Sequence, residues 1–128
     1  MIYADASALV KLVLPEAESS AMVELAKGAP RLVTSALGAT EMRRAVRRDQ
    51  PERLWAVEKA LSEIAIVEIS HEVLRIANVL GPITLRTLDA IHLASALFIR
   101  EEIDSFVVYD TRLAEAARAA GLPVVSPQ

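Results

Sequence analysis

Residues 2–12 read Ile-Tyr-Ala-Asp-Ala-Ser-Ala-Leu-Val-Lys-Leu, and this stretch decides how the chain is organised. Residues 2–5 form an apolar run that ends in an acid, which is typical of a buried strand. A helical pattern follows at once over residues 7–14, and Pro15 ends it. A strand that passes directly into a helix begins a β-α-β unit, so the opening predicts an α/β fold with a largely parallel sheet.

The rest of the chain repeats this alternation. Further strands are predicted over residues 31–34, 64–69, 106–109 and 124–125. Helices are predicted over residues 16–27, 36–48, 51–63, 71–81, 87–99 (or from Thr84) and 111–120, with Ser35 and Ser70 as N-caps. Right-handed crossovers place helices on both faces of such a sheet, and ligand sites lie at the carboxyl ends of its strands.

The composition limits the class of protein. A chain of 128 residues corresponds to one domain, residues 1–128, and 53% hydrophobic with 24% charged residues excludes a disordered chain. The aromatic share of 4% leaves little for a base-stacking platform, and the net charge of -3 argues against nonspecific coating of nucleic acid. Without Cys, a signal peptide or a bilayer-length apolar run, we expect a cytoplasmic protein with no membrane segment.

Two of the five Asp residues, Asp5 and Asp110, stand at the carboxyl ends of predicted strands. Each precedes a helix, so each carboxylate is also a good N-cap, and a cap and a metal ligand are compatible roles. Asp89 lies in the early turns of an apolar helix, where an unpaired carboxylate is costly to desolvate. Taken alone, Asp89 is explained equally well as a first-turn acid, and Glu41 is better explained as a solvated helix acid.

Together, the four acids predict a metal site. All four could meet at one rim of the sheet, where two carboxylates about 4 Å apart repel by about 4 kcal/mol at an effective dielectric of 20. Such a cluster must take up protons or bind a cation. Oxygen ligands without Cys select a hard divalent ion, Mg²⁺ or Mn²⁺, which completes its shell with water and substrate phosphate.

Four segments carry a resemblance to a known family: Asp-Ala-Ser-Ala-Leu-Val-Lys-Leu at residues 5–12, Ser-Ala-Leu-Gly-Ala-Thr-Glu at 35–41, Leu-Asp-Ala-Ile-His-Leu-Ala at 88–94 and Val-Tyr-Asp-Thr-Arg-Leu at 108–113. In this order and over nearly the whole chain, they resemble the motifs of PIN-domain ribonucleases, and more narrowly of VapC toxins. The resemblance implies a three-layer α/β/α fold around a central, mainly parallel sheet. It also implies a homodimer, Mg²⁺- or Mn²⁺-dependent RNA cleavage that leaves 5′-phosphate and 3′-hydroxyl ends, and inhibition by a small VapB-type antitoxin.

The resemblance also assigns roles to residues. Asp5, Glu41, Asp89 and Asp110 become the catalytic and metal-binding acids, and the Ser7 hydroxyl a supporting contact. Some family members carry a further acid after the fourth motif, where this chain has Thr111 and Arg112. We therefore expect one tightly held ion and hydrolysis by in-line attack of water on phosphorus, with Thr111 in support of Asp110.

Basic residues near the acids are candidates for RNA binding. Arg44 and Arg48 share a helix stripe with Glu41, while Arg43 and Arg47 are expected on the solvated face. Lys11 and Arg86 could also reach the rim. We interpret His92, in its apolar helix, as a packed and hydrogen-bonded residue outside the site.

Two other functions fit parts of the pattern. An aspartate-dependent phosphotransferase also uses an acid after the first strand, but it needs a second Asp where Ser7 stands, or a late Lys where the chain has Tyr-Asp-Thr. A noncatalytic PIN-like module that binds RNA or protein would have no reason to keep four mutually repelling acids.

Overall fold

Five short strands form a single parallel sheet in the computed structural model, which describes residues 1–128. Their order across the sheet is β3-β2-β1-β4-β5, so the first strand lies in the middle. The strands are β1 (Ile2–Ala4), β2 (Leu32–Ser35), β3 (Ala65–Val67), β4 (Ser105–Val107) and β5 (Val124–Val125).

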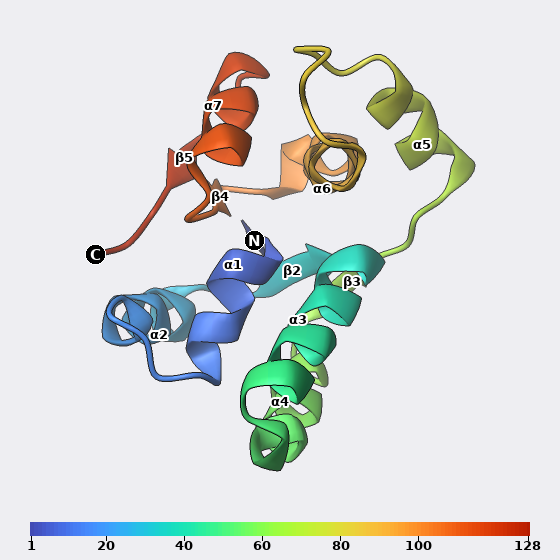
Figure 1. The fold of residues 1–128 in the computed structure, drawn as a ribbon. Helices are drawn as coiled ribbons and strands as arrows, with labels where there is room; N and C mark the ends of the chain where they lie inside the picture. Colours follow the sequence, from blue (N-terminus) through green and yellow to red (C-terminus); the bar gives the residue numbers. More distant parts are fainter.

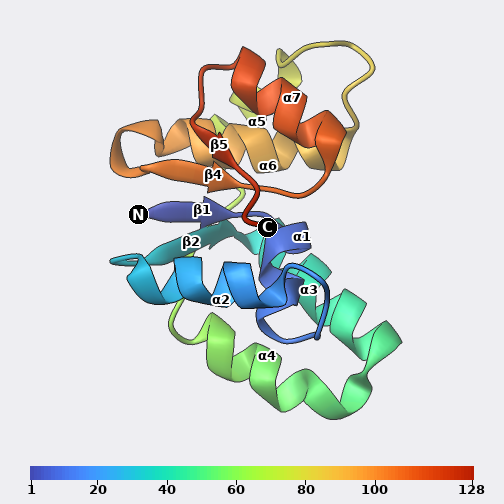
Figure 2. The same cartoon turned by 90° about the vertical axis from the view of Figure 1, so that its left-hand side faces the viewer.

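Seven α-helices cover both faces of this sheet (Figures 1 and 2). One layer holds α1 (Ala6–Leu9), α2 (Ser19–Gly28), α3 (Ala36–Asp49) and α4 (Leu54–Leu61), and the other holds α5 (His71–Asn78), α6 (Thr87–Phe98) and α7 (Thr111–Ala119). Short 3-10 helices η1 (Val10–Leu12), η2 (Pro51–Arg53) and η3 (Arg100–Glu102) complete the chain. The predicted three-layer α/β/α architecture with a parallel sheet is confirmed.

The direction of the chain across the sheet reverses at β1. The strands that follow β1 first, β2 and β3, lie on one side of it, and β4 and β5 lie on the other. Since parallel connections are right-handed, the reversal sends the helices after β1 and after β4 to opposite faces of the sheet. In α/β folds ligands bind beyond the carboxyl ends of the strands at such a reversal, so a site is expected after β1 and β4.

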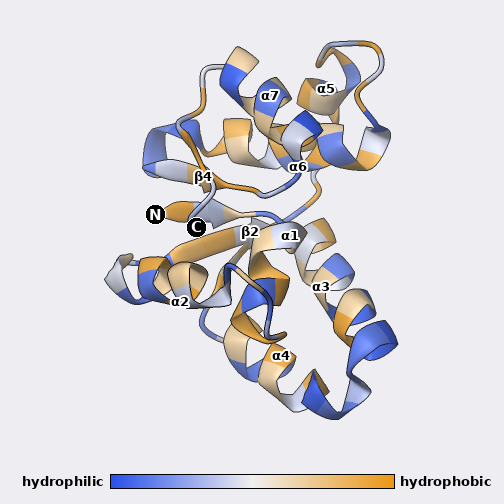
Figure 3. Cartoon of the chain, turned by 60° about the vertical axis from the view of Figure 1, so that its left-hand side comes forward, coloured by the Kyte–Doolittle hydropathy of each residue, from blue (hydrophilic) through white to orange (hydrophobic).

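The alternation of side chains along the strands produces two apolar cores. In β1, Ile2 and Ala4 pack with α1 to α4, whereas Tyr3 packs with the α5 to α7 layer. In β4, Val107 joins the first core and Phe106 the second, where the Phe106 ring stacks on Tyr3. Figure 3 shows hydrophobic residues along the strands and hydrophilic ones gathered where α3 turns into α4.

Most predicted elements are present, but their bounds differ where local geometry intervenes. The predicted helix over residues 7–14 divides into α1 and the 3-10 turn η1, and the predicted helix over 51–63 begins as the 3-10 turn η2. The predicted strand over 64–69 is only β3, because it lies at the sheet edge with Ile66 and Ile69 exposed. The helix predicted to reach residue 81 ends at Asn78.

None of the helices has the combination of length and apolarity that crossing a membrane requires.

Gly38 allows α3 to pack closely against the sheet. A Cβ atom at this position would lie 2.2 Å from Thr34 Oγ1 and 3.2 Å from His92 Cε1. Thr34 is fully buried and its β-branched side chain has little freedom to move away. The absence of a side chain at Gly38 thus sets how near α3, which carries Glu41, comes to α6.

We predict that Gly38→Ala lowers the free energy of unfolding by about 1–3 kcal/mol through overpacking. The matched control is Gly28→Ala at the end of α2, where an added Cβ meets nothing within 4 Å. That control is expected to be neutral or to stabilise by up to about 1 kcal/mol. Urea unfolding of both variants measures the difference, and equal stability of the two would contradict this account of α3 packing.

Candidate active site

Asp5 lies at the end of β1 and is only 5% exposed. Its Oδ1 accepts hydrogen bonds from the Ser7 hydroxyl at 2.6 Å and from the backbone N–H of Ala8 at 3.1 Å, which makes it the N-cap of α1. Both bonds use the same oxygen. Oδ2 of Asp5 makes no hydrogen bond and therefore remains free to coordinate a metal ion.

Ser7 connects the ends of the two central strands. Its Oγ donates to Asp5 and accepts a hydrogen bond from the backbone N–H of Tyr109 at 3.0 Å, just beyond β4. The Asp5 N–H in turn donates to the carbonyl of Val107 at 3.1 Å. These bonds hold the chain after β1 against the chain after β4. The predicted supporting role of Ser7 thus has a physical basis, since it orients the carboxylate of Asp5.

Asp110 and Asp89 come from the opposite layer. Asp110 is the N-cap of α7, where Oδ1 accepts the N–H of Leu113 at 2.9 Å and Oδ2 makes no hydrogen bond. Asp89 lies half-buried in the first turn of α6, and its carboxylate makes no hydrogen bond within the chain. Thr111 follows Asp110 as the first residue of α7 and is exposed. The acids of this layer therefore also keep free oxygens.

Glu41 is held by a buried histidine. Nε2 of His92 is hydrogen-bonded to Glu41 Oε1, and its Nδ1 lies 3.2 Å from the hydroxyl of Tyr3. The ring is 3% exposed, as predicted for a packed and hydrogen-bonded His92. Its contact with Glu41 was not predicted. The only signals for it in the sequence are the inward position of Tyr3 in β1 and the helical spacing of His92 from Asp89.

The carboxylates influence one another electrostatically. Burial raises the pKa of Asp5 from 3.8 to about 6, the bonds from Ser7 and Ala8 and the proximity of His92 oppose this, and the charge of Glu41 adds to it. Burial also raises the pKa of Asp89, with further contributions from Asp110 and Glu41. The charge of Glu41 thus reaches both Asp5 and Asp89, and the charge of Asp110 reaches Asp89.

The donor set fits a hard divalent cation. Asp5, Asp110 and Glu41 each use one oxygen in a hydrogen bond and keep the other, and Asp89 keeps both. No three His, Cys, Asp or Glu side chains stand together in the arrangement of a ready-made metal site. Mg²⁺ is compatible with such an arrangement because it typically takes one or two protein carboxylates and keeps several waters.

A cavity of about 490 Å³ between α1, α3 and the start of α6 adjoins these acids. Ser7, Glu41, Arg44 and Arg48 line it, so the structure brings both predicted arginines to the site. Arg48 is also paired with Asp49 at 2.7 Å, whereas Arg44 has no ion pair.

The other two basic residues predicted to bind RNA, Lys11 and Arg86, do not line this cavity. The Lys11 ammonium is paired with Glu18 at 2.8 Å and Glu16 at 3.3 Å and lies over the Tyr109 ring, so it is not a free cation at the rim. Arg86, the N-cap residue of α6, lies near enough to Asp89 to favour its charged form.

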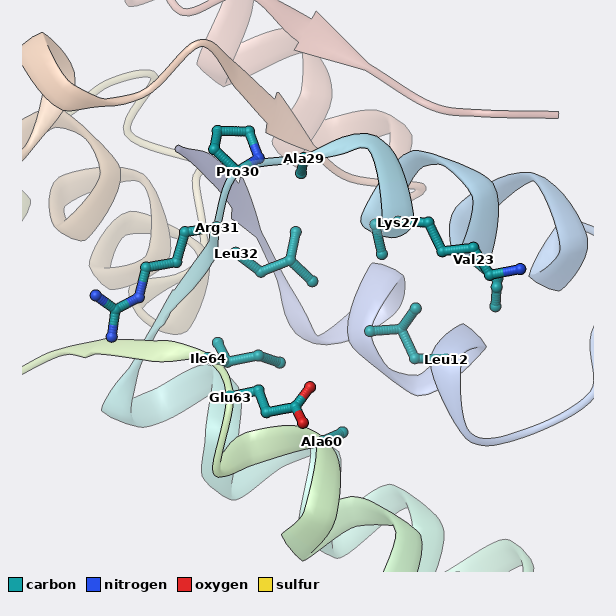
Figure 4. A pocket seen from close by; sticks show the side chains of 11 residues that line it. Leu12, Val23, Lys27, Ala29, Pro30, Arg31, Leu32, Ala60, Glu63 and Ile64 are labelled. Atoms are coloured by element: carbon teal, nitrogen blue, oxygen red, sulfur yellow. The ribbon is translucent and has the colours of Figure 1, made fainter.

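A second cavity of about 450 Å³ lies at the opposite end of β2 (Figure 4). Most of its lining is apolar and includes Leu12 from η1, Val23 from α2 and Ile64 just before β3. Lys27, Arg31 and Glu63 stand at its sides. None of the predicted site residues belongs to this cavity.

The combination of this fold and acidic rim defines a PIN domain. The sequence matches the PIN domain family over residues 2–119. In an alignment 133 positions long, the chain is 38% identical to ribonuclease VapC47 of Mycobacterium tuberculosis, and the alignment covers 99% of this chain and 97% of that protein. The chain belongs to the VapC family of PIN-domain proteins.

Solved structures share the fold. The toxin VapC20 of Mycobacterium tuberculosis, which cleaves the sarcin-ricin loop, aligns over 99% of this chain and 100% of its own, with a TM-score of 0.77 at 17% identity. A toxin–antitoxin complex from Klebsiella pneumoniae aligns over 100% of this chain and 98% of its own, with a TM-score of 0.77 at 23% identity. At these identities the similarity shows a common architecture.

We predict that Asp5→Asn stabilises the metal-free protein by about 1–3 kcal/mol at pH 8. Asparagine keeps an Oδ1 acceptor for Ser7 and Ala8 but removes a charge whose pKa burial has raised to about 6. In the wild type, the Asp5 carboxyl group keeps its proton to a higher pH in the native state than in the unfolded chain. Wild-type stability should therefore fall as pH rises from 3.8 to about 6, and the variant should lack this fall.

Urea unfolding with chelator at pH 5 and pH 8 checks this prediction. A variant that is less stable than wild type at pH 8 would show that the Asp5 charge is favourable in the empty site.

Proposed function

We propose that the protein is a Mg²⁺- or Mn²⁺-dependent endoribonuclease that hydrolyses phosphodiester bonds. One observation carries the proposal: four acids with free carboxylate oxygens come from elements near the carboxyl edge of the sheet, namely Asp5 after β1, Glu41 in α3, Asp89 in the first turn of α6 and Asp110 before α7. Mutual repulsion makes this arrangement unfavourable unless a cation joins it. The names of full-length relatives, which are ribonucleases, support the same conclusion.

Each residue has a proposed task in hydrolysis. Asp5 and Asp89, the two acids whose pKa values burial raises, would hold the ion, with Asp110 and Glu41 completing the negative rim. Ser7 fixes the orientation of Asp5, and Thr111 stands beside Asp110 in support. When bound, the cation supplies Lewis-acid activation of water and neutralises charge on the phosphate.

Arg44 and Arg48 are the proposed contacts for the RNA backbone. Their cavity includes Glu41, so a phosphate held there would lie next to the acids. Arginine suits this role because its planar guanidinium binds phosphate through two parallel hydrogen bonds. Arg86 is proposed for the same role at the start of α6. Lys11 is the weakest member of the predicted set, because Glu16 and Glu18 already occupy its ammonium.

We also propose a VapB-type antitoxin as inhibitor and a homodimer as the assembled form. A toxin–antitoxin complex among structures of the same fold supports the first proposal. A positively charged antitoxin segment would suit the acidic rim, because it could replace the cation as the partner of the carboxylates.

The first test of the function is cleavage of structured RNAs with Mn²⁺. We predict that wild type cleaves, that chelator abolishes cleavage, and that Asp5→Asn and Asp89→Asn each lower the rate by at least about hundredfold, since each loses a proposed ligand. The control is Glu101→Gln in η3, which precedes β4 and so lies at the other end of the sheet. Cleavage that survives both substitutions and chelator would contradict the proposal, and RNA binding without cleavage would favour the noncatalytic module.

A second prediction separates Arg44 from its neighbour Arg43. Arg44 lines the cavity without an ion pair, whereas Arg43 is bound to Glu58 through Nε at 2.6 Å. Arg44→Ala should weaken RNA binding by about tenfold and reduce its salt dependence, while Arg43→Ala leaves both unchanged. Fluorescence anisotropy at several salt concentrations measures this, and equal losses for the two variants would exclude a specific role of Arg44.

A further inference from the structure

A third cavity, of about 600 Å³, lies between the segment that leads into α6 and the exposed side of α7. Its volume falls within the range of small-ligand sites, about 300–1,000 Å³. Pro82 and Leu85 from the first segment and Ala116 and Ala119 from α7 supply its apolar walls. We call this cavity the α6–α7 cleft.

Two guanidinium groups line the α6–α7 cleft beside the carboxylates of Asp89 and Glu115, but neither lies within ion-pair distance of a carboxylate. They belong to Arg86 and Arg112, and both side chains are exposed. Lys11 and Arg48, by contrast, are already paired. An unpaired arginine can bind a phosphate without first giving up a protein partner.

The α6–α7 cleft is continuous with the acidic rim. Asp89 lines it, and Arg112 lies two residues after Asp110 in the first turn of α7. The cavity of about 490 Å³ that Arg44 lines lies on the other side of the α6 N-terminus. It includes Leu88, the residue before Asp89. The first turn of α6 thus separates two cationic cavities that both adjoin the proposed metal site.

We propose that the α6–α7 cleft binds one nucleotide of single-stranded RNA that flanks the scissile bond. Arg112 contacts the backbone phosphate of that nucleotide, and the apolar walls accommodate its base. The strand then crosses the acids, with one flank in the cavity of Arg44 and the other in the α6–α7 cleft. This inference rests on the proposed ribonuclease function and assigns Arg112 a substrate-positioning role that the sequence did not indicate.

Arg112→Ala tests the inference, and Arg118→Ala is the matched control, because Arg118 is exposed on the same helix but does not line the cleft. The substrate is an RNA fragment that spans the cleavage site found with wild type and Mn²⁺. Arg112→Ala should raise KM about tenfold with kcat within about twofold. It should also lower the slope of log K against log salt by about 0.7, the loss of one phosphate contact. Arg118→Ala should match wild type in both measurements.

A neutral methylphosphonate placed at one linkage at a time identifies the contacted phosphate. At one flanking position it should weaken binding to wild type and to Arg118→Ala but leave binding to Arg112→Ala unchanged, because the contact is already lost. Wild-type kinetics and an unchanged salt slope in Arg112→Ala would overturn the assignment of the cleft while leaving the ribonuclease intact. Failure of wild type to cleave any RNA would overturn both proposals.

Discussion

The reversal of strand order at β1 is the constraint on which the rest of the structure depends. Because β1 and β4 are adjacent and their following helices leave toward opposite faces, the chain after each strand lies at the point where α/β folds bind ligands. Asp5 directly follows β1 and Asp110 lies three residues after β4, and each caps the helix that follows. The capping bonds fix the carboxylates in place while leaving one oxygen of each unused. One local arrangement therefore serves both the fold and the site.

A second layer of contacts brings Glu41 to the same end of the sheet. Gly38 allows α3 to approach α6, and His92 then bonds to Glu41 while Tyr3 contacts the other ring nitrogen. Tyr3 belongs to β1, so the position of Glu41 depends on the same central strand as that of Asp5. The site is thus assembled by residues that are distant in sequence but held by contacts to one strand. Burial in this position raises the pKa of Asp5 and so makes its charged form less favourable.

Much of the fold and the acidic set could be predicted from the sequence, for identifiable reasons. Asp5 and Asp110 end apolar runs, and Asp89 interrupts an apolar helix, so local pattern was enough to find them. Glu41 alone fits a solvated helix acid, and it joins the set only through its expected place at the same rim and through the family resemblance. The partner of His92, the pairing of Lys11 with Glu16 and Glu18, and the place of Arg112 beside the cleft depend on long side chains meeting across the fold. The spacing of residues along the sequence does not predict these side-chain contacts.

The central claim is that the carboxylates after β1 and at the start of α6 share one divalent cation. Anomalous diffraction from crystals grown with Mn²⁺ tests it directly, because the ion itself is located. We expect a single strong peak between Asp5 Oδ2 and the carboxylate of Asp89. A peak bound elsewhere, or none at Mn²⁺ concentrations that support RNA cleavage, would contradict it.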